Sequence, residues 1–432
     1  MSGVGDAPIP LGPEDRAILG LECRTIAGHT CKLIRLAPGE RGELGLAELR
    51  ERIAERIALA PALMRRLGGG AHEPAWVDDD DFDLAEHVVA APVERAVTRP
   101  ELRALVARLF EQRLDRSRPL WQIDLAPLRD GGTALIWRIH HALADGTASV
   151  RYARALLWDE SVESSMSSAQ AHAAHAADEA RRRAHLAGFL RREYARGECR
   201  SPFDGKIGTR REVAFAVTPL SALHEAAKLL DDATVNDAVL AIVAGAVGRW
   251  VRRRHGELGT IRLRVPVSLH HEGDAAANRD SFFSIGLPLN EPDPVARLRL
   301  AHAETSERKR DQDAQYREHL LHELSGAPPL ENLLTRIERS PRRFALSVSN
   351  VPGPRESVSV LGNSVLSLHS LAEIGEHHAL RVSAISLAGL LCFGLCADAD
   401  LVDELDLMAD GIEREAQELL QAAGIAAEPR PG

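Results

Sequence analysis

The chain has 432 residues, of which 45% are hydrophobic and 27% are charged, and its formal net charge is −10. This length exceeds what one hydrophobic core usually supports, so we expect two domains or two halves that share a site. The acidic balance lacks the basic face that a nucleic-acid binder needs, and we expect no nucleic-acid partner.

The N-terminus, Met1–Pro10, has neither a basic start nor an apolar stretch, so it does not resemble a signal peptide. The longest apolar segments, Ala238–Val247 and Ala384–Ala397, are well short of the roughly 18 residues that span a bilayer. The five cysteines are an odd number scattered along the chain, which indicates a reducing compartment. We therefore expect a cytoplasmic protein, with membrane contact that is peripheral.

Two helices are predicted early in the chain. Leu46–Leu67 has apolar residues near helical spacing, and Pro100–Leu114 begins after Thr98 with proline in its first turn. Thr133–His140 is rich in β-branched and large apolar residues, which predicts a strand, and Thr147–Trp158 then reads as a helix. The residues between this strand and this helix therefore form a strand-to-helix loop.

The composition changes over Asp159–Arg200 to Ser, Ala, His and Arg, which predicts a linker that includes a solvated helix over Ala169–Tyr194. Helices and strands alternate after it. The predicted helices are Leu220–Leu230 and Val235–Arg253, and the predicted strands are Glu212–Val217, Ile261–Ser268, Phe282–Pro288, Phe344–Ser349, Ser357–Leu368 and Leu380–Leu395. This order predicts an α/β protein with subdomains over 1–158 and 206–432, a linker over 159–205, and a site at the junction.

The loop after the predicted strand carries the most informative motif, His140-His141-Ala142-Leu143-Ala144-Asp145-Gly146. Neighbouring side chains at a strand end point to opposite sides, so we expect one histidine to be structural and the other to face a cavity. A histidine suits proton abstraction because its ordinary pKa, about 6.5, leaves the ring largely neutral at cellular pH.

Each member of this motif also has a purely structural interpretation. Asp145 would serve as the N-cap of the helix that begins near Thr147, which is a common use of aspartate. Gly146 would supply a close backbone approach that a side chain blocks. An isolated buried histidine is more often hydrogen-bonded than catalytic, and it is the whole heptad that favours catalysis.

Four motifs in the same order resemble one family. His140–Gly146 matches HHxxxDG, Pro119-Leu120-Trp121 matches PLW, Asn236-Asp237 matches ND, and Ser349–Pro354 matches SNVPGP. The chain thus resembles the bacterial wax ester synthase/diacylglycerol acyltransferase (WS/DGAT) family. This family belongs to the CoA-dependent acyltransferase (HHxxxDG) superfamily, with chloramphenicol acetyltransferases and the condensation domains of peptide synthetases.

The resemblance implies two chloramphenicol-acetyltransferase-like subdomains with the active site in a tunnel at their interface. It implies transfer of a fatty acyl group from acyl-CoA to diacylglycerol, giving triacylglycerol, or to a long-chain alcohol, giving a wax ester, without an acyl-enzyme. His141 would be the general base, and His140 and Asp145 would support it. Acyl-CoA would be a co-substrate, with no cofactor and no metal. Peripheral contact with the inner face of the membrane or with lipid droplets is expected.

The other motif residues receive supporting roles by the same match. Asn236 is a candidate for polar support of the substrate or oxyanion, or alternatively the N-cap of the helix containing Asp237. Pro119 and Trp121 are expected to pack and turn the chain near the cavity. Ser349 and Asn350 would belong to a rigid strand exit that lines the tunnel.

The sequence departs from the family pattern at four places. Ser386-Leu387-Ala388-Gly389 lacks the tyrosine that is common at its second position, and Leu371–His378 lacks a common proline. Asp204 and Ala277-Asn278 depart from the pattern elsewhere. The acceptor is therefore expected to differ from the usual lipids if the pocket is altered.

The sequence motifs also fit other functions less well. A metal hydrolase would use His140, His141 and Asp145 with a second pair, His270-His271 or His377-His378, although no metal-binding helix motif holds them. The spacing from His140 to Asp145 also fits the membrane-type glycerolipid acyltransferases, but their downstream Phe-Pro-x-Gly element is missing. A catalytically degenerate lipid-surface binding protein, or an HHxxxDG acyltransferase with a condensation-domain-like acceptor, remain the alternatives.

Overall fold

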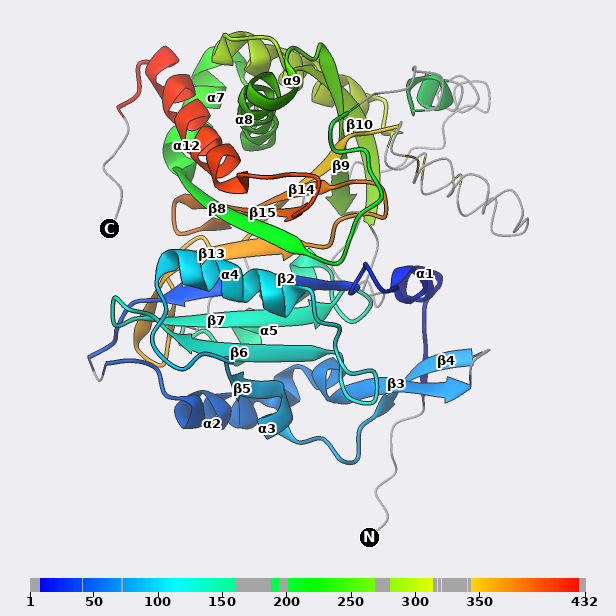
Figure 1. Cartoon of the computed structure of the whole chain (residues 1–432), viewed down its shortest axis with the longest axis vertical. Helices are drawn as coiled ribbons and strands as arrows, with labels where there is room; N and C mark the ends of the chain where they lie inside the picture. Colours follow the sequence, from blue (N-terminus) through cyan, green and yellow to red (C-terminus); the bar gives the residue numbers. More distant parts are fainter. Residues whose placement is uncertain are drawn as a thin grey trace.

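The computed structural model describes residues 8–40, 42–70, 73–160, 188–193, 201–268, 280–313, 317, 320, 340 and 343–426. Two six-stranded sheets lie one above the other, and helices pack on them (Figure 1). A third sheet of three short strands, β1 (Ile9–Pro10), β4 (Glu73–Asp78) and β3 (Arg65–Gly70), lies at one edge. None of the helices within these ranges is long and apolar enough to cross a bilayer.

The first large sheet has the strand order β12-β13-β2-β7-β6-β5. Its strands are β12 (Ser359–Val360), β13 (Asn363–Ala372), β2 (His29–Leu36), β7 (Thr133–His140), β6 (Trp121–Pro127) and β5 (Val88–Ala90). All eight residues of β7 are buried, which explains why its sequence is nearly continuously apolar instead of alternating. In the antiparallel pairing of β2 with β7, His29 lies opposite His140.

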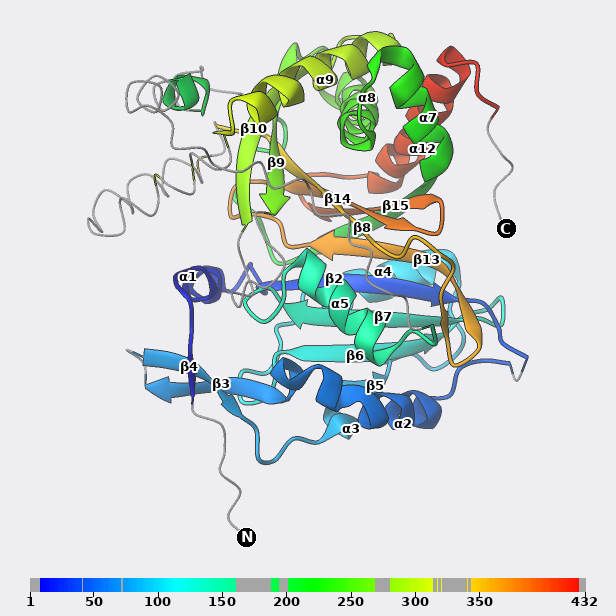
Figure 2. The ribbon, with the colours of Figure 1, turned by 180° about the vertical axis from the view of Figure 1, so that it is seen from behind.

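Helices cover both faces of this sheet. On one face α4 (Arg99–Phe110) contacts β2 and also β8 of the other sheet, so it joins the two halves. Thr98 and Glu101 cap the first turn of α4 reciprocally. The opposite face carries α2 (Leu46–Arg56) and α5 (Gly146–Leu156), which are seen best from behind (Figure 2). Two short helices, α1 (Pro13–Leu21) and α3 (Leu84–His87), lie at the periphery.

The second large sheet has the strand order β10-β9-β11-β14-β15-β8. Its strands are β10 (Asp280–Pro288), β9 (Thr260–Ser268), β11 (Leu346–Val351), β14 (Leu380–Leu387), β15 (Leu390–Asp398) and β8 (Arg211–Pro219). The helices α7 (Leu220–Asp231), α8 (Val235–His255), α9 (Pro294–Arg310) and α12 (Leu405–Ala422) gather on its outer side. α8 is apolar almost all round, because it is enclosed by α7, α9, α12 and the sheet.

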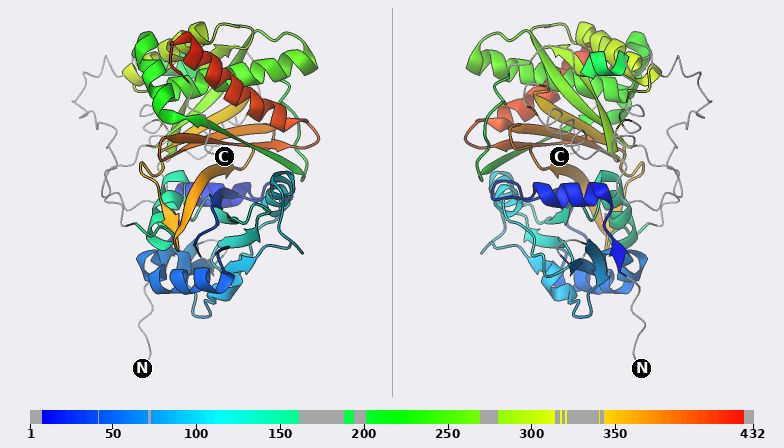
Figure 3. Two further views of the ribbon diagram at one scale, coloured as in Figure 1. Left: turned by 90° about the vertical axis from the view of Figure 1, so that its left-hand side faces the viewer. Right: turned by 90° about the vertical axis from the view of Figure 1, so that its right-hand side faces the viewer.

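The two halves exchange chain segments. β12 and β13 lie between β11 and β14 in the sequence of the second half but complete the first sheet, and β13 contacts both β14 and β15 (Figure 3). The approach is close because residue 394 is glycine, where a Cβ would lie 2.1 Å from the carbonyl oxygen of Ser370. The segment 206–432 thus supplies the second sheet and part of the first. The proposed limits 1–158, 159–205 and 206–432 stay a prediction, and most of the linker lies outside the described residues.

Most predicted elements match the structure to within a few residues, and three differ, among them the strand predicted over Leu380–Leu395, which is the hairpin of β14 and β15 with positive φ at Ala388 and Gly389. The helix predicted over Leu46–Leu67 ends at Arg56, because Pro61 cannot continue an α-helix, and short 3-10 turns lead to β3. The strand predicted over Ser357–Leu368 is two strands, β12 and β13, joined by a turn with positive φ at Leu361 and Gly362. The solvated helix predicted over residues 169–194 lies almost wholly outside the described ranges.

Candidate active site

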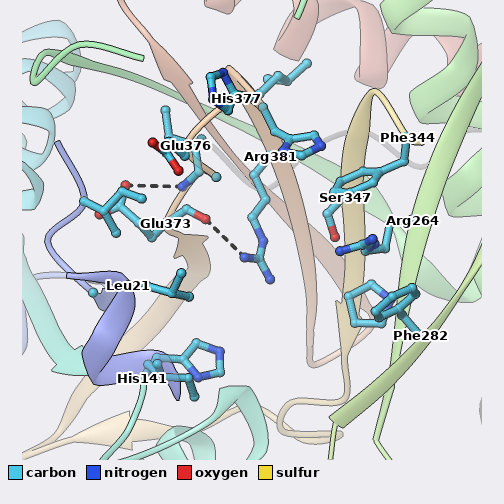
Figure 4. A pocket seen from close by; sticks show the side chains of 18 of the residues that line it. Leu21, His141, Arg264, Phe282, Phe344, Ser347, Glu373, Glu376, His377 and Arg381 are labelled. Atoms are coloured by element: carbon cyan, nitrogen blue, oxygen red, sulfur yellow. Dashed lines mark hydrogen bonds between the residues drawn. The ribbon is translucent and has the colours of Figure 1, made fainter. Parts of the chain in front are cut away.

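A cavity of about 950 Å³ lies between the two halves (Figure 4). Its walls come from α1 and the loop after it, from the start of β2, from β9, β10, β11 and β14, and from the loop that joins β13 to β14. Residues from both halves therefore meet in one space. The lining includes Ile18, Leu21, Gly28, His141, Arg264, Phe282, Phe344, Ser347, Glu373, Glu376, His377 and Arg381.

His141 lies on the wall of this cavity, and His140 does not belong to the lining. β7 ends at His140, and the backbone N–H of His141 donates a hydrogen bond to the carbonyl of Gly28 at 3.0 Å. Burial and the positive charge of Arg381 lower the pKa of His141 to about 4, although Asp145 opposes the shift. The ring is therefore neutral at cellular pH and is able to accept a proton.

His140 is fully buried on the other side of the strand end. Its Nδ1 accepts a hydrogen bond from the backbone N–H of Ala142 at 3.1 Å, and its own backbone N–H donates to Leu120 at 2.9 Å. Burial and the neighbouring His141 lower the pKa of His140 to about 3. This histidine holds the turn together in its neutral form, which matches the structural member of the predicted pair.

Asp145 caps α5. Its Oδ1 accepts a hydrogen bond from the backbone N–H of Ala148 at 2.6 Å, and the residue is 2% exposed. Gly146 follows, and a Cβ at that position would lie 3.0 Å from Cγ2 of Val351, so the helix start packs directly on the SNVPGP segment. Both residues therefore have the structural roles that their types allow, and they join the HHxxxDG loop to the second half.

Sequence reasoning missed a buried lysine beside this loop. Lys32 of β2 is 2% exposed, and its Nζ donates to Oγ of Ser370 on β13 at 2.6 Å. Burial lowers the pKa of Lys32 to about 8, while the charge of Asp145 acts in the opposite direction. The signal in the sequence was weak: the chain has only four lysines, and one of them stands within the strand His29–Leu36, which was not predicted.

The PLW segment belongs to the core of the first half. Trp121 is 1% exposed, donates from Nε1 to the carbonyl of Leu63 at 2.7 Å and stacks on His87 with ring centroids 4.6 Å apart. Pro119 accepts the backbone N–H of Trp121 at 2.8 Å. Neither residue lines the cavity. The link of this segment to the site is indirect and passes through the Leu120 carbonyl that anchors His140.

The ND segment opens α8, away from the lining of the cavity. The alternative interpretation of Asn236 as an N-cap is wrong, because the cap is Thr234, whose side chain accepts from the backbone N–H of Asp237. Asp237 is fully buried and accepts hydrogen bonds from Thr305 and His302 of α9. Burial raises the pKa of Asp237, but these bonds outweigh it and leave the pKa below its ordinary value. The structure gives Asn236 no contact with the cavity.

Ser349 and Asn350 lie on β11, beside the cavity wall but outside its lining. Oγ of Ser349 is 3.0 Å from Oγ of Ser383 on β14. The strand exit that follows is rigid, because the N–H of Gly353 donates to Oγ of Ser386 and a Cβ at Gly353 would lie 2.1 Å from the Ser386 carbonyl oxygen. On this strand it is Ser347 that lines the cavity.

Two of the departures from the family pattern, at Leu387 and at Leu371–His378, fall in different places. Leu387, at the position where the family pattern has a tyrosine, is 1% exposed in the core of the first half and does not line the cavity. The segment 373–378 does form part of that wall, with Glu373, Glu376 and His377 (Figure 4). Glu373 accepts from Arg211 and from the backbone of Ala27, and burial raises its pKa.

The wall opposite α1 is polar and aromatic. The guanidinium of Arg264 lies 3.8 Å from the ring centroid of Phe282 and 3.7 Å from that of Phe344.

Within the described ranges no three His, Cys, Asp or Glu side chains gather as a metal site would require. Of the histidine pairs weighed for a metal, His377-His378 borders the cavity, and His270-His271 lies outside the described residues.

Two sheet-rich halves that share a cavity, with the second histidine of HHxxxDG on its wall, define an acyltransferase of the HHxxxDG type. The wax ester synthase/diacylglycerol acyltransferase catalytic domain matches residues 11–195, and the C-terminal domain of the same family matches residues 276–420. The chain belongs to the wax ester synthase/diacylglycerol acyltransferase family. The resemblance drawn from the four sequence motifs is thereby confirmed.

Individual relatives and solved structures point to the same family. The Mycobacterium tuberculosis protein named "Probable diacyglycerol O-acyltransferase tgs1" is 31% identical over 376 residues, which cover 79% of this chain and 80% of that protein. A wax ester synthase/diacylglycerol acyltransferase from Marinobacter aquaeolei VT8 has the same fold, with a TM-score of 0.74 and 24% identity over 96% of this chain and all of that one. The first condensation domain of the calcium-dependent antibiotic synthetase follows at a TM-score of 0.63 and 17% identity, covering 98% of each chain.

Proposed function

We propose that this acyltransferase moves a fatty acyl group from acyl-CoA to the hydroxyl of diacylglycerol or of a long-chain alcohol, with His141 as the general base. The observation that carries the proposal is the position of His141, a neutral imidazole on the wall of a cavity that both halves line. The names of the relatives, which specify diacylglycerol and wax esters, support the choice of acceptor.

The proposed reaction is a direct transfer. His141 takes the proton of the acceptor hydroxyl while the oxygen attacks the thioester carbonyl carbon. The carbon–sulfur bond then breaks, and the CoA thiolate leaves and takes the proton back from His141. Asp145 favours the imidazolium formed in between, because its charge raises the pKa of His141. No side chain needs to carry the acyl group, and the buried His140 only shapes the turn.

An acceptor panel tests this function. We expect purified enzyme given labelled palmitoyl-CoA to form triacylglycerol from diacylglycerol, or wax ester from hexadecanol, and to release one CoA for each ester. Leu21 lines the cavity and is 37% exposed, so the acceptor should be offered in lipid vesicles as well as in detergent. Because residues 373–378 give the cavity a charged wall, the panel should include polar alcohols. Binding of acyl-CoA without any product across the panel would instead favour a lipid-binding protein.

The pH dependence of kcat/KM is the second test. The base form of His141 is lost as the pH falls through its pKa of about 4, so kcat/KM should stay level from about pH 8 to about pH 5 and decline only below that. Initial rates in overlapping buffers would be measured beside tryptophan fluorescence, which reports whether the protein is still folded. An acid limb centred near pH 6.5 would mean that His141 is not held in the environment described above.

A further inference from the structure

The loop between α1 and β2 brings a carboxylate to the buried side of the histidine turn. The Glu22 side chain is 3% exposed, and its Oε2 forms an ion pair with Arg116. The other oxygen, Oε1, lies 3.9 Å from Nε2 of His140. Among the described residues, neither Oε1 of Glu22 nor Nε2 of His140 has a hydrogen-bond partner. The two buried polar atoms thus face each other across a short gap.

The protonation of the His140 ring follows from its other contact. Nδ1 accepts the backbone N–H of Ala142, and a neutral imidazole that accepts at one nitrogen carries its proton on the other. Nε2 is therefore the donor, and Glu22 presents the acceptor. A buried donor or acceptor without a partner is unfavourable, so closing this gap is favourable.

Gly28 borders the same gap. It has φ +77°, and a Cβ there would lie 2.5 Å from Nε2 of His140 and 3.3 Å from Cγ of Glu22. The carbonyl of Gly28 also accepts the backbone N–H of His141. Gly28 therefore borders Glu22, the structural histidine and the proposed base, and a side chain at this position would clash with His140 and crowd Glu22.

We propose that Glu22 is a positioning residue, whose carboxylate accepts a hydrogen bond from Nε2–H of His140 when substrate fills the cavity and thereby fixes the turn that carries His141. The inference rests on the proposed role of His141. Helix α1 couples the cavity to Glu22. Ile18 and Leu21 of α1 line the cavity, so a ligand that packs against them also contacts the helix that leads into the Glu22 loop. Arg116 orients the carboxylate through its second oxygen.

Kinetics of matched variants test the positioning role. Glu22→Ala should lower kcat about 10- to 100-fold with little change in KM, because a small displacement of the turn misplaces His141 relative to the reacting atoms. Glu22→Gln should keep most of the activity, because its amide oxygen still accepts a hydrogen bond. The control is Glu86→Gln, which removes an exposed charge paired with Arg118 at 2.8 Å and should leave kcat unchanged. If Glu22→Ala only lowers the melting temperature and keeps wild-type kcat, the proposal is wrong.

Histidine NMR provides a readout that does not depend on turnover. With ¹⁵N-labelled histidine, and His140→Asn for assignment, the wild-type spectrum should show His140 protonated at Nε2. Saturation with a non-hydrolysable thioether analogue of palmitoyl-CoA should shift that resonance, and Glu22→Ala should abolish the shift. A His140 ring protonated at Nδ1 would overturn the proposal. Wild-type kcat in the Glu22 variants beside an inactive His141→Ala would sink the inference about Glu22 alone, whereas an active His141→Ala would sink the proposed function.

Discussion

His141→Ala is expected to lower kcat by roughly 10²- to 10⁴-fold at pH 7 while the protein stays folded. The ring lies on the cavity wall and is placed to take the proton of the acceptor in the transition state. KM should change little, because a group that acts on the proton in transit contributes mainly to transition-state binding. The fold should persist because the anchoring contact of residue 141, to Gly28, is made by its backbone.

Steady-state rates of CoA release and of ester formation would be measured for His141→Ala and for a second histidine variant. His224→Ala is the matched control, because His224 is exposed on α7 and far from the lining residues in the sequence and in the fold. Circular dichroism and a thermal melt show whether each variant is folded. Full activity of folded His141→Ala would remove the general base from the mechanism and the support for the function with it.

The local elements of this fold could be predicted because their signals are local. β7 has the predicted bounds Thr133–His140, since a run of β-branched and aromatic residues bounded by turn residues defines a buried strand without any knowledge of its partners. α5 begins one residue before the predicted position because Asp145 is its cap. The expectation that only one histidine of the pair faces the cavity followed from the alternation of side chains along a strand.

The site itself could not be predicted as completely, because most of its members are brought together by long-range pairing. Glu22 and Lys32 reach the histidine turn only because β2 pairs with β7 and β13, and no spacing of residues in the sequence predicts this pairing. Glu373 and Arg381 lie more than two hundred positions away from the HHxxxDG motif in the sequence. The charge of such residues indicates that they belong to the site only once their burial in the structure is known.

Some residues of the motifs that match the family have a structural role and others line the site, and the sequence alone could not separate the two. Trp121 and Asp237 are buried structural residues, whose hydrogen bonds hold β6 and α8 to neighbouring elements. A recurring motif marks a position that tolerates little change, and packing imposes that condition as strongly as chemistry does. Whether a motif residue serves packing or chemistry is decided by whether it is buried in the core or lies on the cavity wall. The adjacent residues His140 and His141 show this difference.

Asp145→Ala is expected to destabilise the protein by about 2–4 kcal/mol and to disorder the loop at least as much as it harms chemistry. The change removes a buried N-cap acceptor, which alone costs about 1–2 kcal/mol. It also leaves the ammonium of Lys32, which is 2% exposed, without the carboxylate charge that favours its ionised form. Asp145→Asn keeps an oxygen for the cap and should lose less stability.

Thermal melts of these variants separate the two contributions when they are compared with Asp293→Ala. Asp293 caps α9 by the same type of bond, to the backbone N–H of Val295 at 3.0 Å, but it is exposed, so its loss should cost only about 1 kcal/mol. Adding Lys32→Met to Asp145→Ala should recover part of the lost stability, because the uncompensated buried charge is then gone. If Asp145→Ala melts like the wild type and yet is inactive, Asp145 acts on the chemistry and not on the loop, because a buried cap with no effect on stability would not be holding the start of α5.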